Sequence, residues 1–366
     1  MKGKVFRYYK VRGSARKGRK MESYIGIDYG GTKLLIGEVD GNGKLLSHMR
    51  FETGKREQGE IVKHLLQCLR VYKERVPQQG LVRGAGIGII GMSSHKTGIW
   101  HSVNHEPGEA VPLAAMVSEI LGVPAAIDND VRSGTTAELL WGCGRYSKDF
   151  IYLSVGTGLA AGMVTDGRIL RGANENAGEI GHISVRGSSE RQCACGRQGC
   201  AELSASGSGI AGNIMEQLKK YPAAGDRRPE AEHMEHLAGI AETGKGSGNE
   251  KESPKEKSAE GRAADVKEVF RLAREGDAIC GRAAEEAAAV LAEVIHNLVR
   301  TSDPDTVVLG GGIMQDAWFL EQVKGRLHPV TMRGVKNGVR ISELKPEWIG
   351  VTGAAAVGKI YCEEQR

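Results

Sequence analysis

The sequence predicts an α/β fold made of two similar domains with a cleft between them. Three observations favour this fold. A short apolar strand at 24–28 runs into a glycine pair and returns as a second strand at 33–39, and the same hairpin pattern restarts at 150–164. A third strand, at 306–309, also ends in a run of glycines. Because about 150 residues make one domain, the length of 366 residues suits two domains, and the repeated hairpins indicate a duplication.

Apolar periodicity and turn residues predict the elements that follow each hairpin. In chain order, these are a helix at 57–75, a strand at 86–90, an irregular polar segment at 92–107, a helix at 112–121, a strand at 125–127 and a helix at 131–141. In the second half, an Ala-rich helix at 278–300 is apolar enough to be largely buried, and it leads to the strand at 306–309. Each hairpin therefore has its own α/β continuation.

Charge is distributed unevenly along the chain. Residues 1–20 contain nine Lys or Arg and no acid, whereas the other residues contain 41 basic and 45 acidic side chains and are mildly acidic. We expect residues 1–20 to be a disordered basic extension, with binding to nucleic acid or to an anionic membrane as the alternatives. Residues 241–264 are rich in Gly, Ser, Lys and Glu, which predicts a disordered surface insertion; the alternative is a docking segment for a partner.

Composition also argues against several classes of protein. No stretch of the chain approaches the roughly 18 consecutive apolar residues that a membrane helix needs. Aromatic residues make up only 5% of the chain, which argues against a base-stacking nucleic-acid surface. Three of the seven cysteines lie within 193–200, so a reducing compartment with a metal site fits better than a disulfide scaffold. We therefore expect a cytoplasmic protein with no membrane partner and no nucleic-acid partner.

Three glycine turns stand at the ends of strands. The first is Asp28-Tyr29-Gly30-Gly31-Thr32-Lys33, and the others are Gly156-Thr157-Gly158 and Gly310-Gly311-Gly312. Glycine lets an anion approach the chain closely, so that backbone N–H groups can hold a phosphate. One such turn is more often a plain hairpin, but three at strand ends indicate phosphate binding. The Walker and Rossmann patterns do not occur in their strand-to-helix setting.

Asp128-Asn129-Asp130 lies between a buried strand and the start of a helix. The helix dipole favours an ionised carboxylate at that position, which makes Asp130 a candidate base. The alternative is that Asp130 merely caps its helix.

A zinc site is the strongest local prediction. His182, Cys193, Cys195 and Cys200 supply one imidazole and three thiolates, which satisfy the tetrahedral preference of zinc and leave no open position for a catalytic water. The metal would therefore be structural. Glu179 and Glu202 lie just outside these ligands, where a pinned loop can hold them in a polar pocket. They can equally be surface acids.

Together these segments resemble the ROK family of repressors, open reading frames and kinases. The resemblance covers about 22–215 and 300–358, and its matching segments are Gly26–Lys33, Asp128–Asp130, Gly156–Gly158, Arg171–His182, the cysteine cluster through Glu202, and Asp303–Gly312. It implies a duplicated ribonuclease-H-like fold of the hexokinase/actin-like ATPase type. The implied domains are 21–140, on which a C-terminal helix at 353–366 packs back, and 141–352, which holds the zinc loop 182–200.

The resemblance further implies a sugar kinase that uses ATP and Mg²⁺. Asp130 would be the base that takes the proton of the sugar's primary hydroxyl. Sugar contacts would come from Asn104, Asn129, Asp130, Glu179, His182 and Glu202, with Asn104 as the loosest match. ATP would be held by Asp28, Gly30, Gly31, Thr32, Lys33, Gly156, Thr157, Gly158, Gly311 and Gly312.

The sequence departs from the family pattern at two places near the implied sugar site. Ile90–Ser94 stands where the family usually has Pro-Gly, and Arg132 stands where it usually has asparagine. Because both departures are near the sugar, they bear on the identity of the substrate more than on the type of reaction.

These features predict an ATP-dependent kinase that transfers the γ-phosphate to the 6-hydroxyl of a hexose, with glucose as the favoured substrate. N-acetylmannosamine, N-acetylglucosamine and fructose are the alternative substrates. A sugar-responsive transcriptional regulator is another possibility, although the 27 residues before Asp28 are too few for the winged helix-turn-helix of such regulators. A third is a sugar sensor without catalysis. We expect a homodimer or homotetramer whose ligands are the hexose and MgATP.

Overall fold

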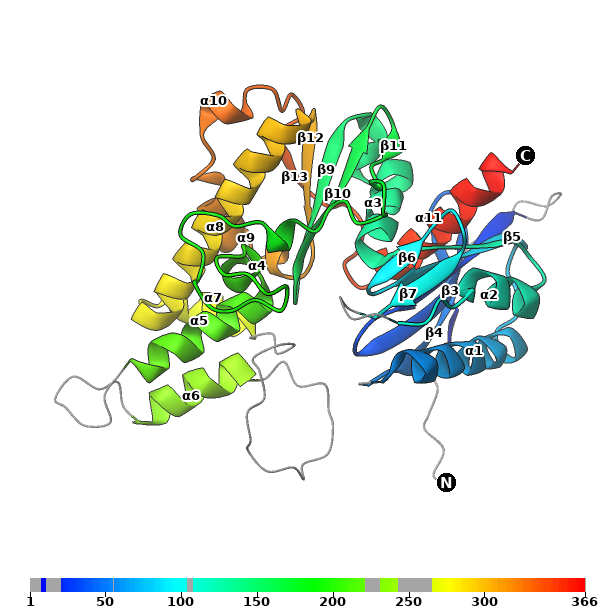
Figure 1. Ribbon diagram of the computed structural model, residues 1–366, viewed down its shortest axis with the longest axis horizontal. Helices are drawn as coiled ribbons and strands as arrows, with labels where there is room; N and C mark the ends of the chain where they lie inside the picture. The colour runs from blue at the N-terminus through cyan, green and yellow to red at the C-terminus, as the bar shows by residue number, and fades with distance from the viewer. Residues whose placement is uncertain are drawn as a thin grey trace. The chain divides into compact units, whose positions relative to one another are not determined.

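The computed structural model describes residues 8–10, 21–54, 56–103, 108–220, 231–242 and 265–365 (Figure 1). The chain divides into two compact units. The first comprises Met1–Lys148, Asp166–Ala177 and Ser342–Arg366, and the second comprises Asp149–Thr165 and Gly178–Ile341. Compared with the predicted domains, the first unit extends to Lys148 and also takes in Asp166–Ala177 and the residues from Ser342 onward.

The first unit is built on a six-stranded sheet in the order β1-β4-β3-β2-β5-β8. Its strands are β1 (Tyr8–Lys10), β2 (Glu22–Tyr29), β3 (Lys33–Asp40), β4 (Leu45–Glu52), β5 (Leu81–Ile89) and β8 (Ala125–Asn129). β2, β3 and β4 form an antiparallel meander, whereas β5 runs parallel to both β2 and β8. The predicted hairpin and the two predicted strands that follow it are confirmed.

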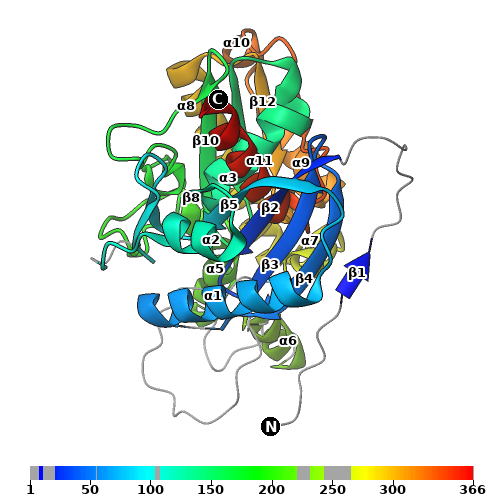
Figure 2. The ribbon, with the colours of Figure 1, turned by 90° about the vertical axis from the view of Figure 1, so that its right-hand side faces the viewer.

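Helices cover both faces of this sheet (Figure 2). They are α1 (Gln58–Arg75), α2 (Leu113–Leu121), α3 (Asp130–Trp141) and α11 (Ile349–Glu364). The helices α1 and α2 bury their apolar sides with Ile25 and Ile27 of β2, while α11 packs with Tyr24 on the other face. A Cβ on Gly26 would lie 1.9 Å from the carbonyl oxygen of Val351, so glycine in β2 allows α11 to approach the sheet closely.

The segment predicted to be irregular at 92–107 contains a short antiparallel hairpin. Its strands are β6 (Met92–Ser94) and β7 (Ile99–Ser102). Trp100 is fully buried and donates its indole N–H to the carbonyl oxygen of Ile90, which anchors the hairpin beside the end of β5. The prediction of an irregular segment is therefore wrong for these strands. They are short and partly polar, so they have no recognisable strand pattern in the sequence.

Part of the basic extension is ordered, in contrast to the prediction of disorder over 1–20. Tyr8–Lys10 forms β1, which pairs antiparallel with Ser47–Met49 of β4 at the edge of the sheet. A strand edge offers unpaired backbone groups, so three residues of almost any composition can pair there. The other residues of the extension lie outside the described part of the chain.

The second unit has its own sheet and one large core. The strands β10 (Leu159–Thr165), β9 (Phe150–Val155), β12 (Thr306–Gly310) and β13 (Val339–Ile341) lie side by side in that order, and the two-residue β11 (Arg168–Ile169) is the neighbour of β10 in this sheet. β9 and β10 are antiparallel, while β12 is parallel to β9 and β13. Its longest helix, α8 (Ala278–Ser302), is buried along its length, as the prediction of a buried helix at 278–300 requires.

Several further elements complete the chain. They are the short strand β11 (Arg168–Ile169), the helices α4 (Glu202–Ala205), α5 (Gly207–Lys219), α6 (Ala231–Glu242), α7 (Val266–Arg274), α9 (Ala317–Lys324) and α10 (Pro329–Met332), and the 3₁₀ turns Cys143–Tyr146, Ile180–His182 and Ile313–Gln315. The predicted insertion at 241–264 lies outside the described residues from 243 to 264, whereas 241 and 242 end α6. No helix in the described part of the chain combines the length and the apolar character that crossing a bilayer requires.

Candidate functional site

The glycine turn between β2 and β3 is exposed and uncrowded. A Cβ placed on Gly31 would have no heavy atom within 4 Å, and one on Gly30 would meet only the carbonyl oxygen of Lys33, at 3.5 Å. The N–H of Gly30 donates to that same carbonyl oxygen at 3.0 Å, which closes the turn. An anion can therefore approach the backbone of this turn without displacing a side chain.

Asp28 lies at the end of β2, immediately before this turn. Burial and the negative charge of Asp130 together raise the pKa of Asp28 to about 7, although the ammonium of Lys33 acts in the opposite direction. A hard divalent cation, which prefers carboxylate oxygens, would stabilise the charged form of Asp28. The donor set therefore fits such a cation.

Asn129 and Asp130 have different positions at the start of α3. Asn129 is the N-cap, and its side-chain oxygen accepts hydrogen bonds from the N–H groups of Val131 at 2.9 Å and Arg132 at 3.4 Å. The N-cap is therefore Asn129 and not Asp130, although a carboxylate oxygen of Asp130 also accepts the N–H of Val131 at 3.0 Å. Asp130 is the first helical residue, where the helix dipole favours its ionised form.

Asp128 is fully buried behind this turn and is compensated by two arginines. The Nε of Arg132 lies 2.6 Å from one carboxylate oxygen, and a terminal nitrogen of Arg171 lies 2.8 Å from the other. Although burial acts to raise it, these two charges hold the pKa of Asp128 below its usual range. Sequence reasoning missed the pair of Asp128 and Arg171 because these residues are 43 positions apart. For the pair of Asp128 and Arg132, the four-residue spacing is the signal that sequence reasoning could have used.

The glycine turns of the second unit also leave open space. A Cβ on Gly156 or on Gly312 would have no heavy atom within 4 Å. Gly311 has a different role, because its φ is 90° and a Cβ there would lie 2.2 Å from the carbonyl oxygen of Val155. The N–H of Gly207, the first residue of α5, donates to the carbonyl oxygen of Gly156 at 2.8 Å and ties the turn to that helix.

Glu202 is packed against one of these turns and is not a free surface acid. One of its carboxylate oxygens accepts the N–H of Leu159 at 2.8 Å, and a Cβ on Gly158 would lie 2.8 Å from the same oxygen. The predicted sugar contact and the predicted phosphate turn are thus immediate neighbours. The other candidate acid, Glu179, has a carboxylate oxygen 4.0 Å from Nε2 of His182.

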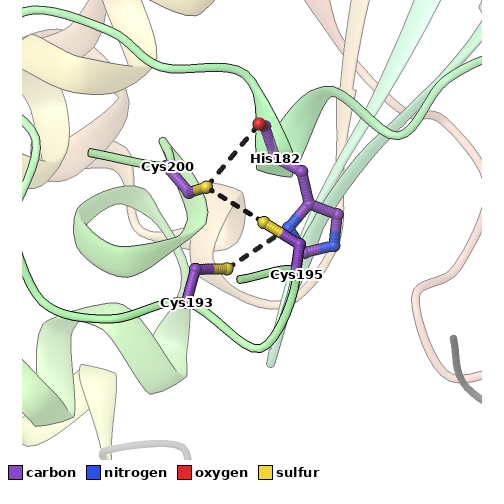
Figure 3. A group of neighbouring side chains, drawn as sticks. All are labelled: His182, Cys193, Cys195 and Cys200. Atoms are coloured by element: carbon purple, nitrogen blue, oxygen red, sulfur yellow. Dashed lines mark hydrogen bonds between the residues drawn. The ribbon is translucent and has the colours of Figure 1, made fainter. Parts of the chain in front are cut away.

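The predicted zinc ligands come together in a single cluster (Figure 3). One ligand atom from each of His182, Cys193, Cys195 and Cys200 lies within 4.8 Å of all the others. The Sγ of Cys193 is 3.4 Å from Nδ1 of His182, and the Sγ atoms of Cys195 and Cys200 are 3.5 Å apart. These separations suit four ligands around one tetrahedral zinc ion, with Nδ1 on the metal side of the ring and Nε2 facing Glu179.

The structure therefore groups the predicted residues within each unit. The first unit brings together Asp28, the Gly30–Lys33 turn, Asn129 and Asp130. The second brings together the Gly156–Gly158 turn with Glu202, and the cysteine cluster with His182 and Glu179. Asn104 lies outside the described residues.

Comparisons with known proteins show the family to which the chain is similar. The ROK family profile matches residues 24–359. Glucokinase of Halalkalibacterium halodurans is 29% identical over 86% of this chain and 88% of its own length. N-acetylmannosamine kinase of Citrobacter koseri is 26% identical over 82% and 87%, and the xylose repressor of Caldicellulosiruptor bescii is 25% identical over 78% and 64%.

Solved structures show the same fold. The ROK hexokinase of Thermus thermophilus superimposes with a TM-score of 0.68 at 25% identity and covers 93% of this chain and 99% of its own. The ROK family glucokinase of Streptomyces griseus, solved in complex with glucose and AMPPNP, has a TM-score of 0.67 at 25% identity and covers 92% and 99%. With its glycine turns, its capped Asn129-Asp130 turn and its cysteine cluster in the α/β units of the actin-like ATPase fold, this chain belongs to the ROK family.

Proposed function

We propose that the protein is an ATP-dependent kinase that phosphorylates the 6-hydroxyl of a hexose. The observation that carries the proposal is the turn at the start of α3, where Asn129 caps the helix and the Asp130 carboxylate is close enough to Asp28 to raise its pKa. Phosphoryl transfer to a hydroxyl needs a general base and a site that holds the phosphates. Here the candidate base lies at a helix N-terminus, near a second carboxylate that precedes a glycine turn.

Asp130 takes the proton of the primary hydroxyl as that oxygen attacks the γ-phosphorus of ATP. The dipole of α3 favours a carboxylate at Asp130, and the amide of Asn129, held by its capping bonds, orients the sugar. The space around the glycines at 30, 31, 156 and 312 lets phosphates approach the backbone, and Lys33 adds positive charge. Asp28 is the residue suited to hold Mg²⁺, which would neutralise phosphate charge when bound.

The remaining sugar contacts in this proposal are Glu179, His182, Glu202 and Asn104. Carboxylates can each accept two hydroxyl hydrogen bonds, and His182 can serve two partners because its ring has two nitrogens. The cysteine side of the ring is Nδ1, which leaves the Nε2 side for a sugar hydroxyl. Zinc at the cluster would hold the loop 182–200, which lies between Glu179 and Glu202 in the chain, and would favour the proton on Nε2 of His182.

Glucose is the substrate we favour, because glucokinases are among the relatives that match most of this chain. The test is a coupled assay of ADP release from MgATP with glucose, mannose, fructose, N-acetylmannosamine and N-acetylglucosamine. We expect sugar-dependent ADP release that is greatest with glucose. Release that is greatest with another sugar would correct the substrate, and release with none of them would overturn the proposed activity.

A second function has a specific observation in its favour, because a xylose repressor is among the relatives. A sugar-responsive regulator would bind DNA and would release it when sugar binds. A gel-shift assay with the full chain, with and without residues 1–20, separates this function from the kinase, for which we expect no sequence-specific DNA binding.

A further inference from the structure

We infer that the segment Asp166–Ala177, here called the strap, positions the turn that carries the proposed base. This inference rests on the proposed kinase function. The strap belongs to the first unit, although the residues on both sides of it in the chain belong to the second. Two of its side chains, Arg171 and Glu175, reach residues that border the Asp128–Asp130 turn. They act as positioning residues and not as substrate contacts.

Asp128 connects the strap to the base. One oxygen of its fully buried carboxylate accepts the N–H of Asn129 at 2.9 Å and the Nε of Arg132 at 2.6 Å, while the other accepts Arg171. The carboxylate of Asp128 thereby fixes the backbone of Asn129, which caps α3 and precedes Asp130. A shift of Asp128 would therefore move the first turn of the helix and the base with it.

The two arginines do not have the same role. Arg132 lies on α3 itself, four residues after Asp128, and can follow any movement of that helix. Arg171 reaches Asp128 from a separate segment, so its ion pair sets where the turn lies with respect to the strap. Removing Arg171 would leave Arg132 on one oxygen of the fully buried Asp128 carboxylate, while the other oxygen would lose its 2.8 Å contact and keep Nδ1 of His95 at 3.9 Å.

Glu175 supplies the second anchor of the strap. Its backbone has a φ of 54°, which is unfavourable for a residue with a side chain, and its buried carboxylate accepts the hydroxyl of Ser94 at 3.0 Å and the backbone N–H of His95. His95 in turn places Nδ1 3.2 Å from the carbonyl oxygen of Ile127 in β8, one residue before Asp128. Both anchors therefore converge on the end of β8.

The strap directly precedes two proposed sugar contacts in the chain. Glu179, a proposed sugar contact, follows the strap by two residues, and His182 follows three residues later. One short segment thus holds the base turn through Arg171 and leads directly into proposed sugar contacts. Phosphoryl transfer depends on alignment, so loosening the strap should affect turnover more than the binding of ATP.

The test compares Arg171→Gln, Arg171→Lys and the control Arg168→Gln, which removes an exposed arginine of the same strap. We expect Arg171→Gln to lower kcat by about tenfold or more while the KM for ATP changes by less than about threefold. Arg171→Lys, which keeps the charge, should recover most of the loss, and Arg168→Gln should resemble the wild type. Equal kcat in Arg171→Gln and Arg168→Gln would overturn the inference.

Hydrogen exchange separates this inference from the proposed function, because it needs no substrate. We expect faster amide exchange at 129–132 in Arg171→Gln than in the wild type or in Arg168→Gln. Unchanged exchange there would overturn the inference even if the wild type phosphorylates a sugar. Faster exchange in a protein that phosphorylates no sugar would overturn the kinase proposal and support the role of the strap in holding the turn.

Discussion

At the scale of single residues, two buried or half-buried aspartates near the start of α3 have opposite surroundings. Asp128 has two arginines within hydrogen-bond distance, which hold its pKa below the usual range. Asp28 is buried and has the charge of Asp130 nearby, so its pKa rises to about 7 although Lys33 acts in the opposite direction. Environments that push the pKa values of neighbouring acids apart are typical of sites that move protons or hold cations. Asp128 therefore serves structure, whereas Asp28 is suited to a cation.

The raised pKa of Asp28 predicts a pH-dependent cost to stability in the absence of a cation. The folded protein holds a proton on Asp28 up to about pH 7, whereas the unfolded chain loses it near pH 4, so stability falls as pH rises between these values. At pH 8, Asp28→Asn should be more stable than the wild type by on the order of 2 kcal/mol, and the difference should shrink toward pH 4. Urea unfolding across this pH range measures it.

Magnesium provides the control for this prediction. At pH 8 we expect Mg²⁺ to raise the melting temperature of the wild type and to leave Asp28→Asn almost unchanged. If the stability difference between the wild type and Asp28→Asn does not vary with pH, ionisation of Asp28 is not its cause.

We propose that zinc at the cysteine cluster links stability to sugar binding through His182. We expect one zinc ion per chain by elemental analysis. Cys195→Ser weakens one ligand, so it should raise the KM for the sugar at least as steeply as it lowers the melting temperature, with less effect on the KM for ATP. Cys362→Ser, which changes a buried thiol in α11, is the matched control. Full kinase activity in zinc-free protein with reduced cysteines would contradict the link.

At the scale of elements, the glycine turns differ in what surrounds them. Gly31 and Gly156 have open space around their Cα atoms, whereas Gly158 is in contact with Glu202 and Gly311 has a positive φ. Only the open turns can accept a side chain without disturbing their own unit. This difference determines which glycine substitutions should change the KM for ATP without changing the KM for the sugar.

Gly31→Val should therefore raise the KM for ATP strongly and leave the sugar KM and the melting temperature nearly unchanged. Its side chain would occupy the space that a phosphate needs, because nothing else lies within 4 Å. Gly41→Val, in the turn after β3, is the control, since the nearest atom to a Cβ there is a carbonyl oxygen at 4.0 Å. Gly158→Val should impair both substrates, because its side chain would displace Glu202. Equal effects of Gly31→Val and Gly41→Val would refute the phosphate role.

Sequence reasoning predicted the elements that have strong periodicity or glycine punctuation. The hairpin of β2 and β3, the buried strand before Asp128 and the long helix α8 were all predictable in this way. The strand β1 and the hairpin of β6 and β7 were not, because edge pairing and a single buried Trp100 leave no periodic pattern.

The same limit applies to the site. Side chains close together in sequence, such as the cysteine cluster, could be grouped in advance. The pairing of Asp128 with Arg171 and the contact of Glu202 with the turn at Gly158 depend on tertiary packing over 43 and 44 positions, which no local pattern encodes.

At the scale of the whole molecule, the described part of the basic extension, Tyr8–Lys10, forms an edge strand. β1 pairs with β4, on the far side of β3 and β2 from β8, whose end carries Asn129. Deleting residues 1–7 keeps β1, whereas deleting 1–20 exposes the edge of β4.

We expect both truncated proteins to keep their kinase constants within a factor of about two or three. The longer deletion should also lower the melting temperature and promote aggregation, because an unpaired strand edge is a template for association. Steady-state kinetics and light scattering provide the measurements. A large loss of activity in the 1–20 deletion alone, without aggregation, would instead assign the extension a role in catalysis or substrate capture.

If Asp130 is the base of a sugar kinase, as we propose, Asp130→Asn removes that base. The substitution keeps the size of the side chain, and Asn129 continues to cap α3, so stability should hardly change. We predict that the rate of phosphoryl transfer from ATP to the preferred sugar falls by a factor on the order of 10² to 10⁴, with a melting temperature close to that of the wild type. Transfer at the wild-type rate by a folded Asp130→Asn protein would contradict the account.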